Sequence, residues 1–95
     1  MRLISQDGRV DLPYEMVCVS LDILNGLNIK VCTLAEVDSW TFAHYSTKER
    51  ASMARKLMVY AYTRKKNYGR DYFRFPSDDD IEEQYNMIFK KGREV

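Results

Sequence analysis

The chain has 95 residues, of which 31% are charged, and a formal net charge of +1, which fits one soluble domain over residues 1–95. No apolar run is long enough for a signal peptide or a membrane span, so we expect a cytoplasmic protein. Two cysteines are too few for a disulfide scaffold, and we expect free thiols. A core this small gives modest stability. We therefore expect the chain to form a homo-oligomer, which would add to that stability.

The charges are unevenly distributed along the chain. Residues 1–47 carry three basic and six acidic side chains, residues 48–74 carry nine and two, and residues 75–95 carry three and six. The middle block therefore has a charge of +7 between two flanks of −3 each. This block is the sharpest clue to function in the sequence.

A short hairpin is predicted at the start of the chain. Leu3–Ser5 and Arg9–Leu12 are short apolar runs on either side of a polar turn. Gly8 follows Asp7 in that turn and supplies the positive φ that tight hairpin turns need. Pro13 ends the hairpin or starts an edge strand, because it lacks an amide donor.

Residues 15–23 and 27–35 are rich in apolar and β-branched side chains and predict the longest hairpin. A two-residue Asn25-Gly26 loop would place Lys30 on the apolar face. A three-residue loop that ends with Gly26 in the left-handed conformation gives one continuous apolar face instead, and we expect this second register. It places Cys18 opposite Cys32, Ser20 opposite Lys30 and Asp22 opposite Asn28.

A turn at residues 37–39 leads to a further strand and a helix. Residues 40–45 alternate with period two, which predicts a strand with Trp40 and Phe42 facing the core. Ser46 and Glu49 match a capping box, in which each side chain accepts a hydrogen bond from the other residue's backbone amide. Small and apolar side chains then recur at helical spacing and predict a buried stripe of Ala51, Ala54, Leu57, Met58 and Ala61.

The last two predicted elements are a short strand and a second helix. Residues 71–75 predict a strand with Phe73 and Phe75 inward, which Pro76 stops. Ser77 is the predicted N-cap of the helix, and the aspartates after it suit the positive end of the helix dipole. The apolar stripe of this helix is Ile81, Tyr85, Ile88 and Phe89, and its negative end carries Lys90, Lys91 and Arg93.

The order of these elements, β-β-β-β-β-α-β-α, predicts the α+β class. We expect an antiparallel sheet of hairpins packed with two helices, which lie on one face or at one end of the sheet.

None of the reactive side chains forms a recognisable active site, so we expect no enzymatic activity, metal or cofactor. Cys18 and Cys32 lack the four ligands of a zinc site, and directly opposed cysteines fit disulfide geometry poorly. His44 has no nucleophile or orienting carboxylate at a suggestive spacing. The acidic run from Asp78 to Glu83 lacks the pattern of a calcium loop, and helix capping explains it.

The basic block predicts a binding surface. Its cations suit phosphates, and tyrosines interleaved with them, such as Tyr60 and Tyr62, suit stacking on bases. The same composition also fits a solvated helix face or an oligomer interface. The candidate residues for binding an anion or a partner are Arg64, Lys65, Lys66, Tyr68, Arg70, Tyr72 and Arg74.

Four stretches of the chain can be compared with known proteins: Met1–Gly8, Val10–Glu15, Tyr45–Glu49 and Phe73–Pro76. Together they resemble a family of small uncharacterised proteins from phages and integrated mobile elements of Gram-positive bacteria. The resemblance implies an accessory protein in a bacterial cytoplasm, and such proteins often bind and inhibit host factors, including defence systems. It brings no catalytic residue with it.

From these observations we expect a non-enzymatic binding protein that recognises a host protein or a small anionic ligand such as a nucleotide signal. The alternative is a small nucleic-acid-binding regulator that uses the basic, tyrosine-rich segment 48–74. A small nuclease is the least favoured class, because no carboxylate cluster lies on a predicted strand.

Overall fold

The computed structural model describes residues 1–22, 24–33, 39–64 and 71–90, and the strands in these ranges form two three-stranded sheets. The first sheet, in the order β2-β1-β6, consists of β1 (Arg2–Ile4), β2 (Asp11–Pro13) and β6 (Tyr72–Arg74). The second sheet, in the order β3-β4-β5, consists of β3 (Val17–Leu21), β4 (Asn28–Thr33) and β5 (Trp40–His44). A single 3-10 turn, Tyr14–Met16, joins β2 to β3.

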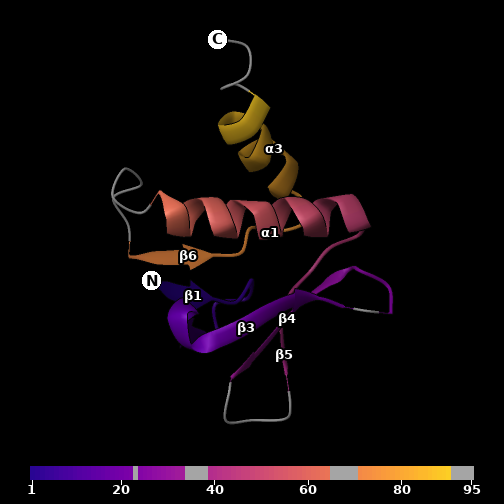
Figure 1. Cartoon of the computed structure of the whole chain (residues 1–95). Coiled ribbons are helices and arrows are strands. Elements are labelled where there is room, and N and C mark those ends of the chain that lie inside the picture. The colour runs from indigo at the N-terminus through magenta and orange to yellow at the C-terminus, as the bar shows by residue number, and fades with distance from the viewer. Residues whose placement is uncertain (23, 34–38, 65–70, 91–95) are drawn as a thin grey trace.

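Two helical segments complete the described fold. Helix α1 spans Lys48–Thr63, and helix α3 spans Ile81–Tyr85 and continues into the π-helical segment Asn86–Lys90. Figure 1 shows α1 lying over β6 and β1, while α3 leads away from α1 toward the C-terminus. The predicted α+β class and the predicted order of strands and helices are thus confirmed.

The N-terminal hairpin forms as predicted, and Gly8 has a φ of +77° in its turn. The expectation of one antiparallel sheet is wrong in two respects. The strands divide between two sheets, and β6 pairs with β1 in parallel, with Leu3 opposite Phe73. A parallel neighbour needs a long crossover connection, and here β3, β4, β5 and α1 all lie between β1 and β6 in the sequence.

The long hairpin has the predicted register. Cys18 lies opposite Cys32 and Ser20 opposite Lys30, and Gly26 adopts a φ of +70°. The first strand is shorter than predicted, because its first two residues, 15 and 16, belong to the 3-10 turn. Residues 23, 34–35 and 37–38 of the predicted hairpin and turn lie outside the described residues.

A β-bulge in β5 breaks the predicted alternation. Ala43 lies opposite Ile29 and Thr41 lies opposite Lys30, so Phe42 is the extra residue. Phe42 and Ala43 are both buried as a result, and so is Tyr45, while His44 is exposed. Phe42 therefore faces the core as predicted, and Trp40 is only half-buried against it.

The predicted capping box at the start of α1 is wrong by one residue. Thr47 is the N-cap, and its side chain accepts a hydrogen bond from the amide of Arg50 at 3.1 Å. The amide of Ser46 instead donates to the carboxylate of Asp78 at 2.8 Å. A carboxylate from another part of the chain thus takes the place predicted for Glu49.

The second helix begins later than predicted, at Ile81, and its N-cap is Asp80 in place of Ser77. Ser77 Oγ accepts a hydrogen bond from the amide of Asp80 at 3.2 Å, in the turn that precedes α3. Ile81 is fully buried, and the other members of the predicted stripe pack against the core. Residues 91–95 at the predicted end of this helix lie outside the described residues.

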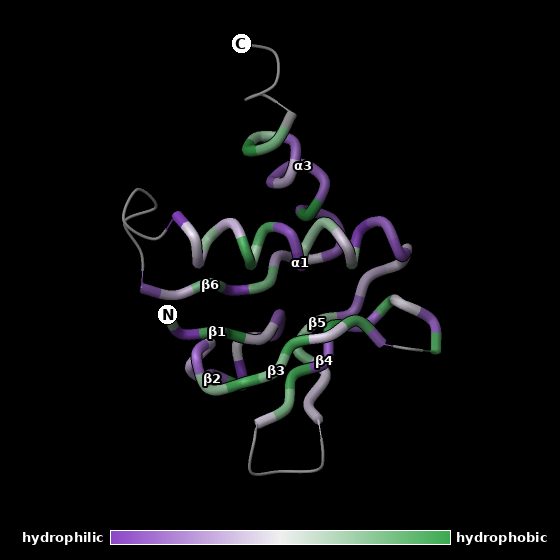
Figure 2. Tube along the Cα trace, in the orientation of Figure 1, coloured by the Kyte–Doolittle hydropathy of each residue, from purple (hydrophilic) through white to green (hydrophobic). Residues whose placement is uncertain are grey.

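One hydrophobic core unites both sheets and both helices. The predicted stripe of α1 is confirmed, because all five of its members are buried. Figure 2 shows hydrophobic residues, in green, along β1, β3 and β4. From the first sheet and the residue after β6 come Leu3, Phe73 and Phe75. From the second sheet and the residue after β5 come Ile29, Val31, Phe42, Ala43 and Tyr45. The helices add Ala51, Ala54, Leu57, Met58, Ala61 and Ile81.

Candidate binding surface

Helix α1 carries an exposed face opposite its buried stripe. Lys48, Ser52, Arg55, Lys56 and Val59 recur at helical spacing, at positions i, i+4, i+7, i+8 and i+11, so they share one side of the helix. The three cations are exposed, and Val59 is 38% exposed. The packing of the alanine stripe on the sheets turns this side toward solvent. We call these five residues the α1 surface.

Two shallow hollows lie along this surface where α1 meets the second helical segment. The first, of about 380 Å³, is lined by Lys48, Glu49, Ser52, Met53, Lys56 and Tyr85. The second, of about 290 Å³, is lined by Arg55, Lys56, Val59, Tyr60 and Phe89. Lys56 borders both hollows, which places a cation between two partly apolar depressions.

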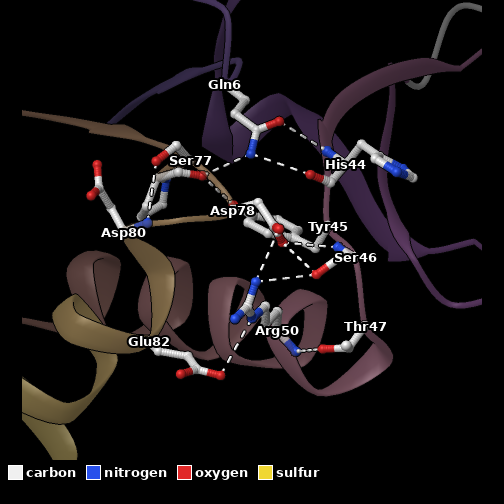
Figure 3. A network of polar contacts seen from close by, with 11 residues as sticks. Gln6, His44, Tyr45, Ser46, Thr47, Arg50, Ser77, Asp78, Asp80 and Glu82 are labelled. Atoms are coloured by element: carbon white, nitrogen blue, oxygen red, sulfur yellow. Dashed lines mark hydrogen bonds and ion pairs between the residues drawn. The ribbon is translucent and has the colours of Figure 1, made fainter.

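Of the four cations on α1, only Arg50 is neutralised by a described carboxylate. Its guanidinium lies 3.0 Å from Asp78 and 3.3 Å from Glu82 (Figure 3). Lys48, Arg55 and Lys56 form no ion pair with any residue that the structure describes. The α1 surface thus keeps three positive charges, which are available to an acidic partner.

The polar network around Asp78 fixes the start of α1 against the turn before α3. The Asp78 carboxylate accepts hydrogen bonds from the amide and hydroxyl of Ser46 and from the guanidinium of Arg50 (Figure 3). The bond from the Ser46 amide, and then the nearby positive charge of Arg50, lower the pKa of Asp78 below its ordinary value. The network therefore positions the α1 surface beside α3.

This network makes the fold sensitive to acid. Because the pKa of Asp78 is lower in the folded chain than in the unfolded chain, its stabilising effect is complete above the unfolded pKa and is lost as pH falls from there through the lower folded pKa. We expect the thermal unfolding temperature to fall between about pH 5 and pH 3. Asp78→Asn should lower that temperature at neutral pH and reduce the acid-induced fall.

The matched control for this prediction is Asp79→Asn, which removes an exposed carboxylate from the next position. It should leave both the neutral unfolding temperature and the acid-induced fall close to those of the unchanged chain. Asp7 and Asp22 also have lowered pKa values, because backbone and side-chain groups donate hydrogen bonds to them. A residual fall in Asp78→Asn is therefore expected, whereas an undiminished fall would contradict the role of Asp78.

The candidate residues predicted from the basic segment lie in two places where the structure describes them. Arg64 follows α1, and its guanidinium lies over the ring of Tyr60, 5.8 Å from the centroid. Tyr72 and Arg74 are exposed on β6, and Arg74 donates a hydrogen bond to the carbonyl of Gln6 at 3.1 Å. The other candidates, Lys65, Lys66, Tyr68 and Arg70, lie outside the described residues.

The tyrosines of α1 pack within the fold. The ring of Tyr60 meets Phe89 edge to face, with centroids 5.4 Å apart, and the ring of Tyr62 lies 4.6 Å from that of Tyr14. Their aromatic surface therefore helps to hold α3 and the 3-10 turn against α1. The sequence suggested that Tyr60 and Tyr62 would stack on bases, whereas in the structure their rings pack on other aromatic rings of the fold.

Sequence reasoning missed the α1 surface itself. The signal was present, because Lys48, Arg55 and Lys56 lie on the side of the helix opposite the predicted buried stripe. The contribution of Phe89 could not be foreseen, because only the packing of the π-helical segment on α1 brings that ring to Val59 and Tyr60.

The other reactive side chains gather into no further centre. Cys18 and Cys32 are free thiols on paired strands, and Nδ1 of exposed His44 lies 2.6 Å from Oδ1 of Asn28. In the described ranges, no three or more His, Cys, Asp or Glu side chains are grouped to hold a metal ion. The same ranges contain no helix of the length and apolarity that crossing a membrane requires.

The predicted resemblance to phage proteins stays a prediction. Comparisons of this chain with protein-family models, with curated proteins and with solved structures give no match.

Proposed function

We propose that this chain is a non-enzymatic binding protein that docks an acidic segment of a partner protein on the α1 surface. The observation that carries the proposal is a group of three exposed cations, Lys48, Arg55 and Lys56, that form no ion pair with a described residue. Arg55 and Lys56 also line a hollow with the apolar side chains of Val59 and Phe89. An apolar patch with a charged border is typical of protein interaction sites. The positive border selects partners with Asp or Glu.

The aromatic side chains favour a protein partner over a nucleic acid. Surfaces that bind single-stranded nucleic acids combine cations with aromatic rings on which bases stack. Here the ring of Tyr60 packs on Phe89, and that of Tyr62 packs on Tyr14.

The biological setting is part of the same proposal. We infer a phage-type accessory protein that acts on a host protein in the bacterial cytoplasm, with inhibition of a host defence factor as its effect. The support is the sequence resemblance described above, together with a binding surface that needs no chemistry. Purification of the host complex with the unchanged chain as bait, and with the variant below as a negative control, would identify the factor.

Binding to the α1 surface can be tested with a fluorescein-labelled peptide that forms an acidic amphipathic helix of glutamate and leucine. We expect Lys56→Glu to weaken binding by about tenfold in fluorescence anisotropy, because it reverses a central charge of the surface. Arg9→Glu is the matched control, since it makes the same change in net charge at an exposed residue of the N-terminal hairpin. It should change the affinity less than about twofold.

Equal weakening by both variants would show that only net charge matters, and the proposal would fail. A short duplex or single-stranded DNA with the same label provides the second comparison. Tighter binding of either DNA than of the peptide at the same salt concentration would favour the nucleic-acid alternative.

A further inference from the structure

The two cysteines form a cross-strand pair. Cys18 of β3 lies directly opposite Cys32 of β4. The amide of Asp22 donates to the carbonyl of Asn28 at 2.9 Å, which makes these two residues a hydrogen-bonded pair. Because such pairs recur at every second residue of an antiparallel ladder, the cysteines form a hydrogen-bonded pair too. Their Cα atoms are then about 5.5 Å apart, within the range that disulfides span.

Both thiols can be reached by a small molecule. Strand β3 is at the edge of its sheet, and Cys18 is exposed, while Cys32 on the central strand β4 is half-buried. A hollow of about 450 Å³ adjoins Cys32, and Lys30 is among its lining residues. Asp22 lines the same hollow, so the charges of Lys30 and Asp22 balance there and the hollow can admit small molecules of either charge.

We propose that Cys18 and Cys32 form a dithiol site that reacts with small disulfides, for which oxidised glutathione is the probe. The thiolate of the more exposed Cys18 attacks one glutathione sulfur, forms a mixed disulfide and releases the first glutathione thiol. The thiolate of Cys32 then attacks Cys18 Sγ, closes the cross-strand disulfide and releases the second. The protein dithiol loses two electrons and two protons, and one disulfide is reduced to two thiols.

The cross-strand bond is readily reversible because it is strained. Opposed side chains on neighbouring strands have Cβ atoms about 4.5 to 5.5 Å apart, with hydrogen-bonded pairs at the wide end. A disulfide brings its Cβ atoms to about 3.8 Å. Closing the bond must therefore draw edge strand β3 toward β4, and strained disulfides are the more easily reduced ones. This site is independent of the α1 surface and belongs to the second sheet.

Mass spectrometry without reductant tests the site. After treatment with oxidised glutathione and alkylation of remaining thiols, the unchanged chain should lose two hydrogens, take up no alkyl group and stay free of intermolecular disulfides. Cys32→Ser should stop at the mixed disulfide and retain one glutathione. Cys18→Ser should form its adduct more slowly, since its remaining thiol is half-buried. Excess reduced glutathione should restore both thiols of the unchanged chain.

Three results would overturn the proposal: a stable glutathione adduct on the unchanged chain, disulfide-linked dimers as its main product, or no reaction. A cross-strand disulfide that resists excess reduced glutathione would overturn the reversible exchange. Circular dichroism of both serine variants checks that the hairpin is intact, and serine at these partly exposed positions should leave the spectrum unchanged.

Discussion

Replacing Phe75 with alanine will lower the free energy of unfolding by about 3 to 5 kcal/mol. Phe75 is 1% exposed and follows β6 of the first sheet. Its ring meets those of Phe42 and Phe73 edge to face, with centroids 6.4 and 5.2 Å away. Since Phe42 belongs to the second sheet, alanine would open a cavity where the two sheets meet. Urea denaturation followed by circular dichroism measures the loss.

Two further variants serve as comparisons for the loss of stability in Phe75→Ala. Phe75→Leu keeps an apolar side chain and much of the volume, so it should cost less than about 1.5 kcal/mol. Met16→Ala removes an apolar side chain that is 65% exposed and should stay within about 1 kcal/mol of the unchanged chain. If Phe75→Ala cost no more than Met16→Ala, the two sheets would not share the core described here.

The parts of the fold that depend on neighbouring residues could be predicted from the sequence. The register of the β3–β4 hairpin follows from the requirement that Lys30 avoid the apolar face, and the Gly26 turn enforces it. The buried stripe of α1 follows from the spacing of its alanines in the same way. Each of these patterns lies within one element or one hairpin.

The features that were missed depend on contacts between distant parts of the chain. Nothing in the residues of β6 indicates that its partner is β1, because parallel pairing is set by the path of the intervening chain. The cap of α1 moves to Thr47 because Asp78 takes the amide of Ser46. The bulge at Phe42 is associated with a similar long-range contact, since its carbonyl accepts the amide of Gln6 at 2.6 Å.

The candidate site likewise has one part that follows from local sequence and one part that depends on distant contacts. Its cations could be located from the sequence, because their helical spacing alone places Lys48, Arg55 and Lys56 on one side of α1. Its apolar part could not, because Phe89 reaches α1 only through the packing of Tyr60 and Tyr85 on its ring. A surface built from two elements needs the tertiary structure for its definition, whereas a charged helix face does not.

Gln6 links the N-terminal hairpin to strand β5 and to Pro76 by hydrogen bonds of its side chain and its backbone. Its side-chain amide donates to the carbonyls of Pro76 at 2.9 Å and His44 at 3.3 Å, and its side-chain oxygen accepts the amide of His44 at 3.1 Å (Figure 3). Its own amide donates to the carbonyl of Phe42 at 2.6 Å. One residue of the N-terminal hairpin thus serves as a hydrogen-bonding partner for the bulged strand β5.

Gln6→Ala should therefore lower the free energy of unfolding by about 1 to 2 kcal/mol, because the amide and carbonyl of His44 lose their side-chain partner, whereas the carbonyl of Pro76 keeps its bond from the Tyr45 hydroxyl. The matched control is Gln84→Ala at an exposed position of α3, which should stay within about 0.5 kcal/mol of the unchanged chain. Gln6→Glu keeps the acceptor but turns a carboxylate toward the carbonyls of His44 and Pro76, so it should also destabilise at neutral pH. Relative to the unchanged chain, that variant should recover part of the loss below about pH 4, where a protonated carboxyl can donate again. Equal unfolding free energies for Gln6→Ala and Gln84→Ala would mean that apolar packing alone joins the two sheets.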